Sequence, residues 1–207
     1  SEDQNNIDFY MYPADVPIIT ADRSQLNFGA DRNGHITGPQ QFFITDTSGK
    51  NYRYHLTCDS SWVRIVPTSA TGSATITVSV DDSGLSPGVR QGTINIGAVG
   101  DPYTYLEVKV VLTVLQSNDH IRPFGSFDLP VNGGTVSGSI PVTGWALDNI
   151  GLKSVEIYRD PLPGESDKWI FIGNAILVRG ARPDIEAAFP DYPGNDKAGW
   201  GYMMLTH

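Results

Sequence analysis

The sequence predicts an all-β protein whose antiparallel strands pack as sandwiches. Apolar and polar residues alternate in short runs, as in 73–80 and 105–114, and this alternation is typical of strands with one buried face. Clusters of Gly, Pro, Asp and Ser separate the runs at the close spacing of turns between antiparallel strands. No segment of the first half has the periodicity of a helix, so we expect strands and turns throughout it.

Composition indicates a folded chain and excludes several classes of partner. Hydrophobic residues make up 40% of the 207 residues and charged residues 18%, which is typical of a globular protein. The net charge of -9 leaves no basic surface to neutralise phosphates, so we expect no binding to nucleic acid. No apolar run approaches the ~20 residues of a membrane-spanning helix, and residues 1–10 lack the basic start and apolar centre of a signal peptide. We therefore expect a mature or trimmed soluble chain that inserts into no membrane.

Cysteine and histidine usage predicts neither a disulfide nor a metal site. Cys58 is the only cysteine, and it takes an inward position in the alternation of a strand over 52–58, so we expect a structural thiol. Sequence motifs of esterases, zinc hydrolases and phosphate-binding loops are absent. The sequence thus predicts no cofactor, no metal and no catalytic residue. The histidines, which show no ligand spacing, are His35, His55, His120 and His207.

The first half of the chain resembles a known family of bacterial modules. The segments "LNFGA", "SSWVRIVPTSATGSATITVSVDDSGLSPGVRQGTINI" and "YLEVKVVLTV" are similar to the immunoglobulin-like modules called BACON or BACON-like domains, across about 17–115. This resemblance implies an immunoglobulin-like sandwich at 17–117 after an N-terminal extension at 1–16. The family name implies carbohydrate binding, but many such modules resemble spacers. Because a tryptophan buries a large area, we expect Trp62 to pack against the core or a sheet edge.

A second resemblance follows a polar linker at 118–122. The segments "VSGSIPVTGWALD", "ARPDIEAAFPDYP" and "GWGYMMLT" are similar to bacterial immunoglobulin-like domains with blocks such as "SGWALD", "ARPDVEAAFPGYP" and "GWGYMLLT", across 123–207. Such a sandwich usually has about seven strands, whereas the long loops here leave room for roughly four or five. We therefore expect a domain truncated at its C-terminus. Its open edge near Tyr202–Leu205 would favour self-association or closure by a neighbouring domain.

The segment 181–200 is predicted to be a structural lid. Alternation over 140–148 turns Trp145 away from the narrow face of its strand, so that ring needs a cover. Pro183 and the acids after it suit one helical turn, and a charge-assisted hydrogen bond between Arg182 and Asp184 can fasten that turn. The expected lid residues are Trp145, Arg182, Asp184, Phe189, Tyr192 and Trp200.

Acidic residues of this region leave a chemical interpretation open. Asp184, Glu186, Asp191 and Asp196 can supply carboxylates for glycoside hydrolysis or oxygen ligands for calcium. The sequence shows neither a calcium-loop spacing nor a separate acid-base pair, which favours structural roles. Asp148 is expected to accept hydrogen bonds from amides of its own loop rather than to bind a metal.

The sequence as a whole predicts two tandem immunoglobulin-like β-sandwiches that form a non-catalytic accessory, spacer or adhesive segment of an exported or cell-surface bacterial protein. One alternative is a carbohydrate-binding module attached to a secreted enzyme, and another is a hydrolase built on acids of the second domain. The expected partners are a glycan or neighbouring domains of the parent protein. The aromatic residues that can form a stacking platform for a glycan are Trp62, Tyr103, Tyr105 and Trp169.

Overall fold

A computed structural model of the chain describes residues 19–47, 49, 51–100, 104–116, 121–165 and 168–206. The expected N-terminal extension at 1–16 and residues 118–120 of the expected linker lie outside this described part, as does Tyr103.

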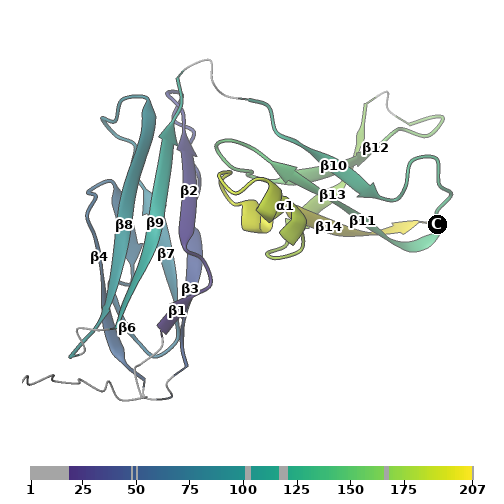
Figure 1. The fold of residues 1–207 in the computed structure, drawn as a ribbon. Coiled ribbons are helices and arrows are strands. Elements are labelled where there is room, and N and C mark those ends of the chain that lie inside the picture. Colours follow the sequence, from purple (N-terminus) through teal and green to yellow (C-terminus); the bar gives the residue numbers. More distant parts are fainter. Residues whose placement is uncertain are drawn as a thin grey trace, which may run out of the picture.

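The N-terminal sandwich, defined here as residues 19–114, consists of two facing sheets (Figure 1). One sheet has four strands in the order β1-β3-β7-β5, and the other has five in the order β2-β9-β8-β4-β6. The strands are β1 (Ile19–Ala21), β2 (Gln25–Ala30), β3 (Gln40–Asp46), β4 (Arg53–Cys58), β5 (Val63–Val66), β6 (Ser69–Thr71), β7 (Ala74–Val80), β8 (Gly88–Ala98) and β9 (Tyr105–Val114).

Alternation along these strands explains the core of the N-terminal sandwich. In β4, for example, Tyr54 and Leu56 are buried, while the alternate residues Arg53, His55 and Thr57 are exposed. Inward side chains from both sheets form one cluster, in which Phe28, Phe42 and Tyr54 are the largest fully buried residues. Cys58 is half-buried against this cluster, and burial raises the pKa of its thiol, which fits a structural role.

The chain changes sheets between its first two strands. β1 pairs antiparallel with β3, whereas β2 pairs parallel with β9 in the opposite sheet. The connection between β1 and β2 therefore runs along the side of the sandwich, and it contains Asp22 and Arg23. This position brings both charged residues to the surface that faces the second half of the chain.

The C-terminal sandwich, defined here as residues 124–206, is built from one five-stranded sheet in the order β10-β11-β14-β13-β12. β13 pairs with β12 over residues 170–175 but with β14 only at Ile176 and Leu177, so it connects two layers. The elements of the C-terminal sandwich are β10 (Phe124–Leu129), β11 (Gly138–Leu147), β12 (Val155–Arg159), β13 (Ile170–Leu177), α1 (Pro183–Ala188), the short 3-10 helix η1 (Asn195–Lys197) and β14 (Gly199–Thr206).

A small apolar core lies between these two layers. Val142 of β11, Ile157 of β12 and Trp200 of β14 are buried against one another. Trp200 lies over Gly144, where an added Cβ atom would be 2.4 Å from the indole ring, so the narrow face expected around Gly144 accommodates this tryptophan. The predicted all-β class of immunoglobulin-like sandwiches is confirmed, and the five strands that the structure describes in the second sandwich agree with the roughly four or five expected.

The last strand is incompletely paired, as the sequence predicted. β14 pairs with β11 along its whole length, but in the described part of the chain its other side pairs with β13 only at Trp200 and Gly201. Beyond that point Met203 and Leu205 are 60% and 72% exposed. The edge near Tyr202–Leu205 is thus open, which leaves backbone groups available for another strand.

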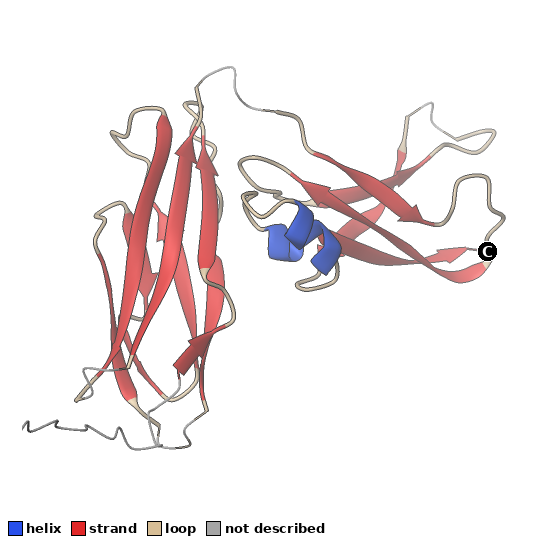
Figure 2. Ribbon diagram, in the orientation of Figure 1, coloured by secondary structure: helices blue, strands red, loops and turns tan. Residues whose placement is uncertain are grey.

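The two sandwiches meet through the helical segment of the second. Figure 1 shows that the strands of the C-terminal sandwich run across those of the N-terminal sandwich, with α1 between the two units. Figure 2 shows that helix occurs at this one place in the described part of the chain. The segment that the sequence identified as a lid is therefore part of the junction between the sandwiches.

Candidate functional site

The lid, defined here as residues 181–198, packs over the face of β11 that carries Trp145 and Leu147. Leu147, Ile185 and Ala198 are buried together, with aromatic rings around them. The ring centroid of Trp145 lies 5.8 Å from that of Phe189, and Phe189 lies 5.7 Å from Tyr192. The structure thus brings Trp145, Phe189 and Tyr192 together, as the sequence suggested.

Trp200 does not belong to this cluster, so its assignment to the lid is corrected. Its neighbour Gly199 pairs with Trp145, and alternation turns Trp200 to the opposite face of the sheet. There it packs into the core with Val142 and lies 5.8 Å from the ring of Phe127.

Arg182 fastens the start of α1. Its Nε and Nη2 atoms donate to the two carboxylate oxygens of Asp184 at 2.9 and 2.7 Å, and its Nη1 atom donates to Asp128 of β10 at 2.7 Å. The paired geometry with Asp184 is the expected charge-assisted contact. Through Asp128 it also attaches the lid to the edge of the sheet.

Asp184 should titrate at an unusually low pH. The hydrogen bonds from Arg182 lower the pKa of Asp184 from 3.8 to about 2. Because the folded-state pKa is depressed, the contact stabilises the lid above about pH 4, and this contribution is lost as the pH falls through about 2. Carboxyl-carbon NMR should give a pKa near 2 in the native chain and a value closer to 3.8 in Arg182→Gln. A normal Asp184 titration in the native chain would contradict this account.

An ion cluster joins the lid to the N-terminal sandwich. Asp196 of η1 lies 3.3 Å from Nη1 of Arg23 and 3.0 Å from Nε of Arg179, and Arg179 also contacts Asp22 at 3.1 Å. The side chains of Arg23 and Asp196 are only 8% and 7% exposed. Burial lowers the pKa of Arg23, and the nearby Asp196 carboxylate opposes that effect. The pair is therefore a buried charge contact between the two units.

Uncharged groups complete this part of the junction. Arg23 donates to Gln40 at 3.1 Å and to Asn195 at 3.3 Å. The amide of Asn195 in turn donates to the Phe189 and Pro190 carbonyls, which braces the lid from within. Asn27 of β2 donates to the Pro190 carbonyl at 2.7 Å, which is a further direct contact between the sandwiches.

The loop after β11 makes a separate contact with the N-terminal sandwich. Gly29 lies so close to it that an added Cβ atom would be 2.0 Å from the Asn149 carbonyl oxygen. The hydroxyl of Thr37 also donates to the Ile150 carbonyl. Asp148 accepts a hydrogen bond from the Ile150 amide at 2.8 Å, which is the loop-fastening role expected of it.

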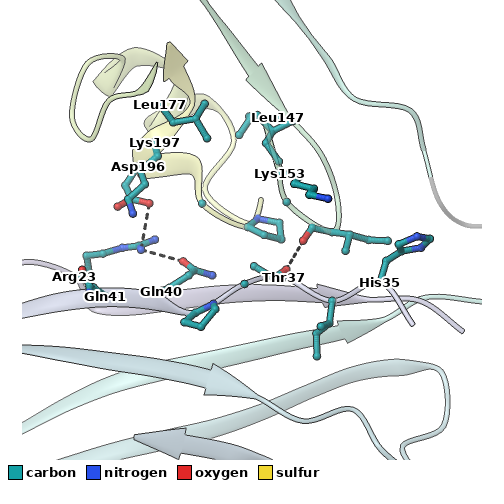
Figure 3. A pocket seen from close by; sticks show the side chains of 18 of the residues that line it. Arg23, His35, Thr37, Gln40, Gln41, Leu147, Lys153, Leu177, Asp196 and Lys197 are labelled. Atoms are coloured by element: carbon teal, nitrogen blue, oxygen red, sulfur yellow. Dashed lines mark hydrogen bonds and ion pairs between the residues drawn. The ribbon is translucent and has the colours of Figure 1, made fainter. Parts of the chain in front are cut away.

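A cleft of about 590 Å³ lies between these two contacts. Figure 3 shows the Arg23–Asp196 pair at one side of the cleft and the Thr37 contact at the other, with Gln40 between them. Lys153 and Lys197 also line it.

Of the four aromatic residues proposed as a stacking platform, the three that the structure describes do not come together. Trp62 is half-buried against the N-terminal core, which favours its packing role, and Tyr103 lies outside the described residues. Tyr105 is 57% exposed on β9, and its hydroxyl donates to Asn95 and Glu107. Trp169 is 75% exposed in the other sandwich.

Trp169 has aromatic neighbours that the sequence analysis did not identify. The ring centroid of Tyr158 lies 6.4 Å from that of Trp169 and 5.5 Å from that of Phe171. Tyr158 is 45% exposed and Phe171 is 52% exposed. Pairing of β12 with β13 brings Tyr158 opposite Phe171. Alternation places each ring on the outside of its strand, but only the strand register shows that they are neighbours.

In the described part of the chain, no group of three or more His, Cys, Asp or Glu residues lies in a position to bind a metal ion. The acids considered for hydrolysis or calcium are divided, since Asp184 pairs with Arg182 and Asp196 with Arg23. In the same described residues, no helix has the length and apolar character of a membrane span.

In comparison with known proteins, one family model matches part of the chain. Residues 53–117 match the model of the BACON family, described as "Putative binding domain, N-terminal". The resemblance to BACON domains is thereby confirmed over this range. A comparison with curated proteins found no match.

Several solved structures show a limited similarity to this chain. A Bacteroides ovatus GH5 xyloglucanase in complex with a XXXG heptasaccharide matches 47% of this chain at 17% identity, with a TM-score of 0.38. The periplasmic chaperone SfaE matches 65% at 10% identity (TM-score 0.36; 95% of SfaE), and the Ig1-2 module of Drosophila DLAR matches 77% at 14% identity (TM-score 0.33; 85% of that module). The match spans 19% of the length of the xyloglucanase.

Proposed function

We propose that this chain, which carries a BACON domain at residues 53–117, is a non-catalytic accessory segment that sets two immunoglobulin-like sandwiches at a fixed angle. In this proposal it acts as a rigid spacer within an exported or cell-surface bacterial protein. The buried Arg23–Asp196 pair between the two units is the observation that carries the proposal.

A flexible pair of domains would not need such a junction. Contacts between neighbouring domains are often small and polar, and relative motion is then expected. Here a buried ion pair, the Asn27 contact with Pro190 and the close approach at Gly29 act together. An ion pair with little solvent exposure depends strongly on orientation, so these contacts favour one arrangement over many.

Nitrogen-15 relaxation NMR tests the proposed rigidity directly. If the junction holds, amides of both sandwiches will report one common rotational correlation time. Two shorter and different correlation times in the native chain would contradict a rigid spacer, even if both sandwiches are folded.

The proposed lack of catalysis is supported by the partners of the acidic residues. Asp184 and Asp196 are each paired with arginine side chains, which disfavours a role as proton donor. We expect no turnover of glycosides, esters or peptides by the purified chain. Turnover that disappears in a folded Glu186→Ala or Asp184→Ala variant would show that the second domain is a hydrolase.

Glycan binding is a second candidate function, supported by the exposed cluster of Tyr158, Trp169 and Phe171. Three exposed aromatic rings on neighbouring strands offer apolar faces to a sugar chain. In a polysaccharide pull-down, Trp169→Ala should weaken binding by about tenfold, as expected for a central aromatic contact. Tyr105→Ala removes a ring with 57% exposure from the other sandwich and is the matched control. Equal binding by both variants would reject this cluster as the glycan site.

A further inference from the structure

The C-terminal sandwich has a groove along its open side. In the described residues, β10 pairs only with β11 and β12 pairs only with β13, so both strands are free edges of the same sheet. Because β13 passes from one layer to the other, these two edges form opposite walls of a groove of about 490 Å³. Phe127 belongs to the β10 wall, and Val155 belongs to the β12 wall.

The floor of the groove is part of the apolar core. Ile157 and Trp200, which pack together in the core between the layers, also line the groove. Phe127 is 57% exposed at its entrance and contacts the Trp200 ring. Ile157 and Trp200 are each only 8% exposed, so among these three Phe127 is the apolar side chain that this open side leaves largely in contact with water. Such exposed apolar area is unfavourable in water.

We propose that the groove accepts an extended strand of another polypeptide, which pairs with the free edge of β12 at Val155–Arg159. Only a polypeptide in the β conformation can match a row of unpaired backbone N–H and C=O groups along a strand edge. Alternate side chains of that strand would point to Ile157 and Trp200 and complete the core.

The charge of the rim indicates which strand fits. Glu156 and Asp160 line the groove, whereas Arg159 is bound by Glu165 through contacts of 2.5 and 2.6 Å. The net charge around the entrance is therefore negative, and the whole chain has a formal charge of -9. A strand with basic residues beside its apolar positions is complementary, and a second copy of this acidic chain is less so.

A designed peptide provides the test. The probe has about seven residues with valine at alternate positions and lysine at both ends, long enough to cover a typical short strand. Fluorescence anisotropy measures its affinity for the full chain, and amide hydrogen exchange locates it. We expect slower exchange at residues 155–159, together with tighter binding than for the same peptide carrying a central proline, which cannot form the ladder.

Variants of two exposed phenylalanines of the C-terminal sandwich distinguish peptide binding in the groove from non-specific hydrophobic binding. Phe127→Ala should weaken peptide binding by about fivefold or more, whereas Phe171→Ala, with 52% exposure but outside the groove, should leave it unchanged. Asp160→Lys should also weaken binding, because it reverses a rim charge. All three positions are exposed, so the variants are expected to fold.

Several results would overturn the proposal. These are equal affinity of the two phenylalanine variants, equal affinity of the proline peptide, or protection at residues 202–206 in place of 155–159. A dimer that forms without peptide and is lost in Phe127→Ala would assign the groove to a second copy of the chain and would also reject it. Protection of β12 by a polysaccharide but not by the peptide would reject it in favour of a glycan site.

Discussion

Replacing Asp196 by alanine is expected to release the two sandwiches from each other while each remains folded. The change removes the nearest carboxylate from Arg23, whose side chain is 8% exposed and lies near the positive Arg179. Removing one partner of a buried ion pair typically costs about 3–5 kcal/mol, because the remaining charge stays desolvated. Arg23 can regain water only if the junction opens. Nitrogen-15 relaxation should then give two shorter correlation times, and X-ray scattering a larger radius of gyration.

Asp184→Ala is the control for this prediction, since it removes an ion-paired aspartate from the same lid. The Asp184 side chain is 60% exposed, and exposed ion pairs contribute about 1 kcal/mol or less. We expect it to preserve the common correlation time. Asp196→Asn keeps the shape of the side chain but removes its charge. If the two sandwiches also tumble independently in this variant, the charge of Asp196 is the decisive property. A single correlation time in Asp196→Ala would mean that the ion cluster does not determine the orientation.

Gly29→Val should open the other contact of the junction. An added Cβ atom would be 2.0 Å from the Asn149 carbonyl oxygen and 2.9 Å from the Ile150 Cα atom. Both are backbone atoms, so the strand and the loop must separate by roughly 1 Å or more to reach ordinary contact, which is costly in a packed interface. Valine itself is favourable in a strand, so β2 should still form. We expect the same loss of common tumbling, measured by relaxation NMR.

Gly97→Val is the matched control for Gly29→Val. Gly97 lies in β8, where an added Cβ atom would have no heavy atom within 4 Å. It should leave the orientation unchanged, with a stability change within about 1 kcal/mol. The double variant Gly29→Val with Asp196→Ala should add little to the worse single variant, because both act on one junction. Fully additive effects would show that the two contacts are independent.

The pattern of strands could be predicted because it depends on local information. The alternation around Tyr54 and Leu56 determines which side chains face the core, and the structure buries both. The contact between Arg182 and Asp184 could also be predicted, since the two residues are two positions apart. The assignment of Trp200 to the lid was wrong because it considered proximity along the chain, whereas the register of β14 against β11 turns this residue to the other face.

The sequence by itself determined the all-β class, the alternation of each strand, the BACON resemblance and the lid turn, because each depends on residues close together in the chain. Only the tertiary structure decided that the lid is also a junction, since Arg23 and Asp196 are far apart in sequence and nothing in their neighbours indicates a partner. It also decided that the edges of β10 and β12 face one groove, because strand order in a sheet depends on backbone pairing between distant segments. Backbone pairing and charge contacts form between whole surfaces, and a surface exists only after the strands have packed.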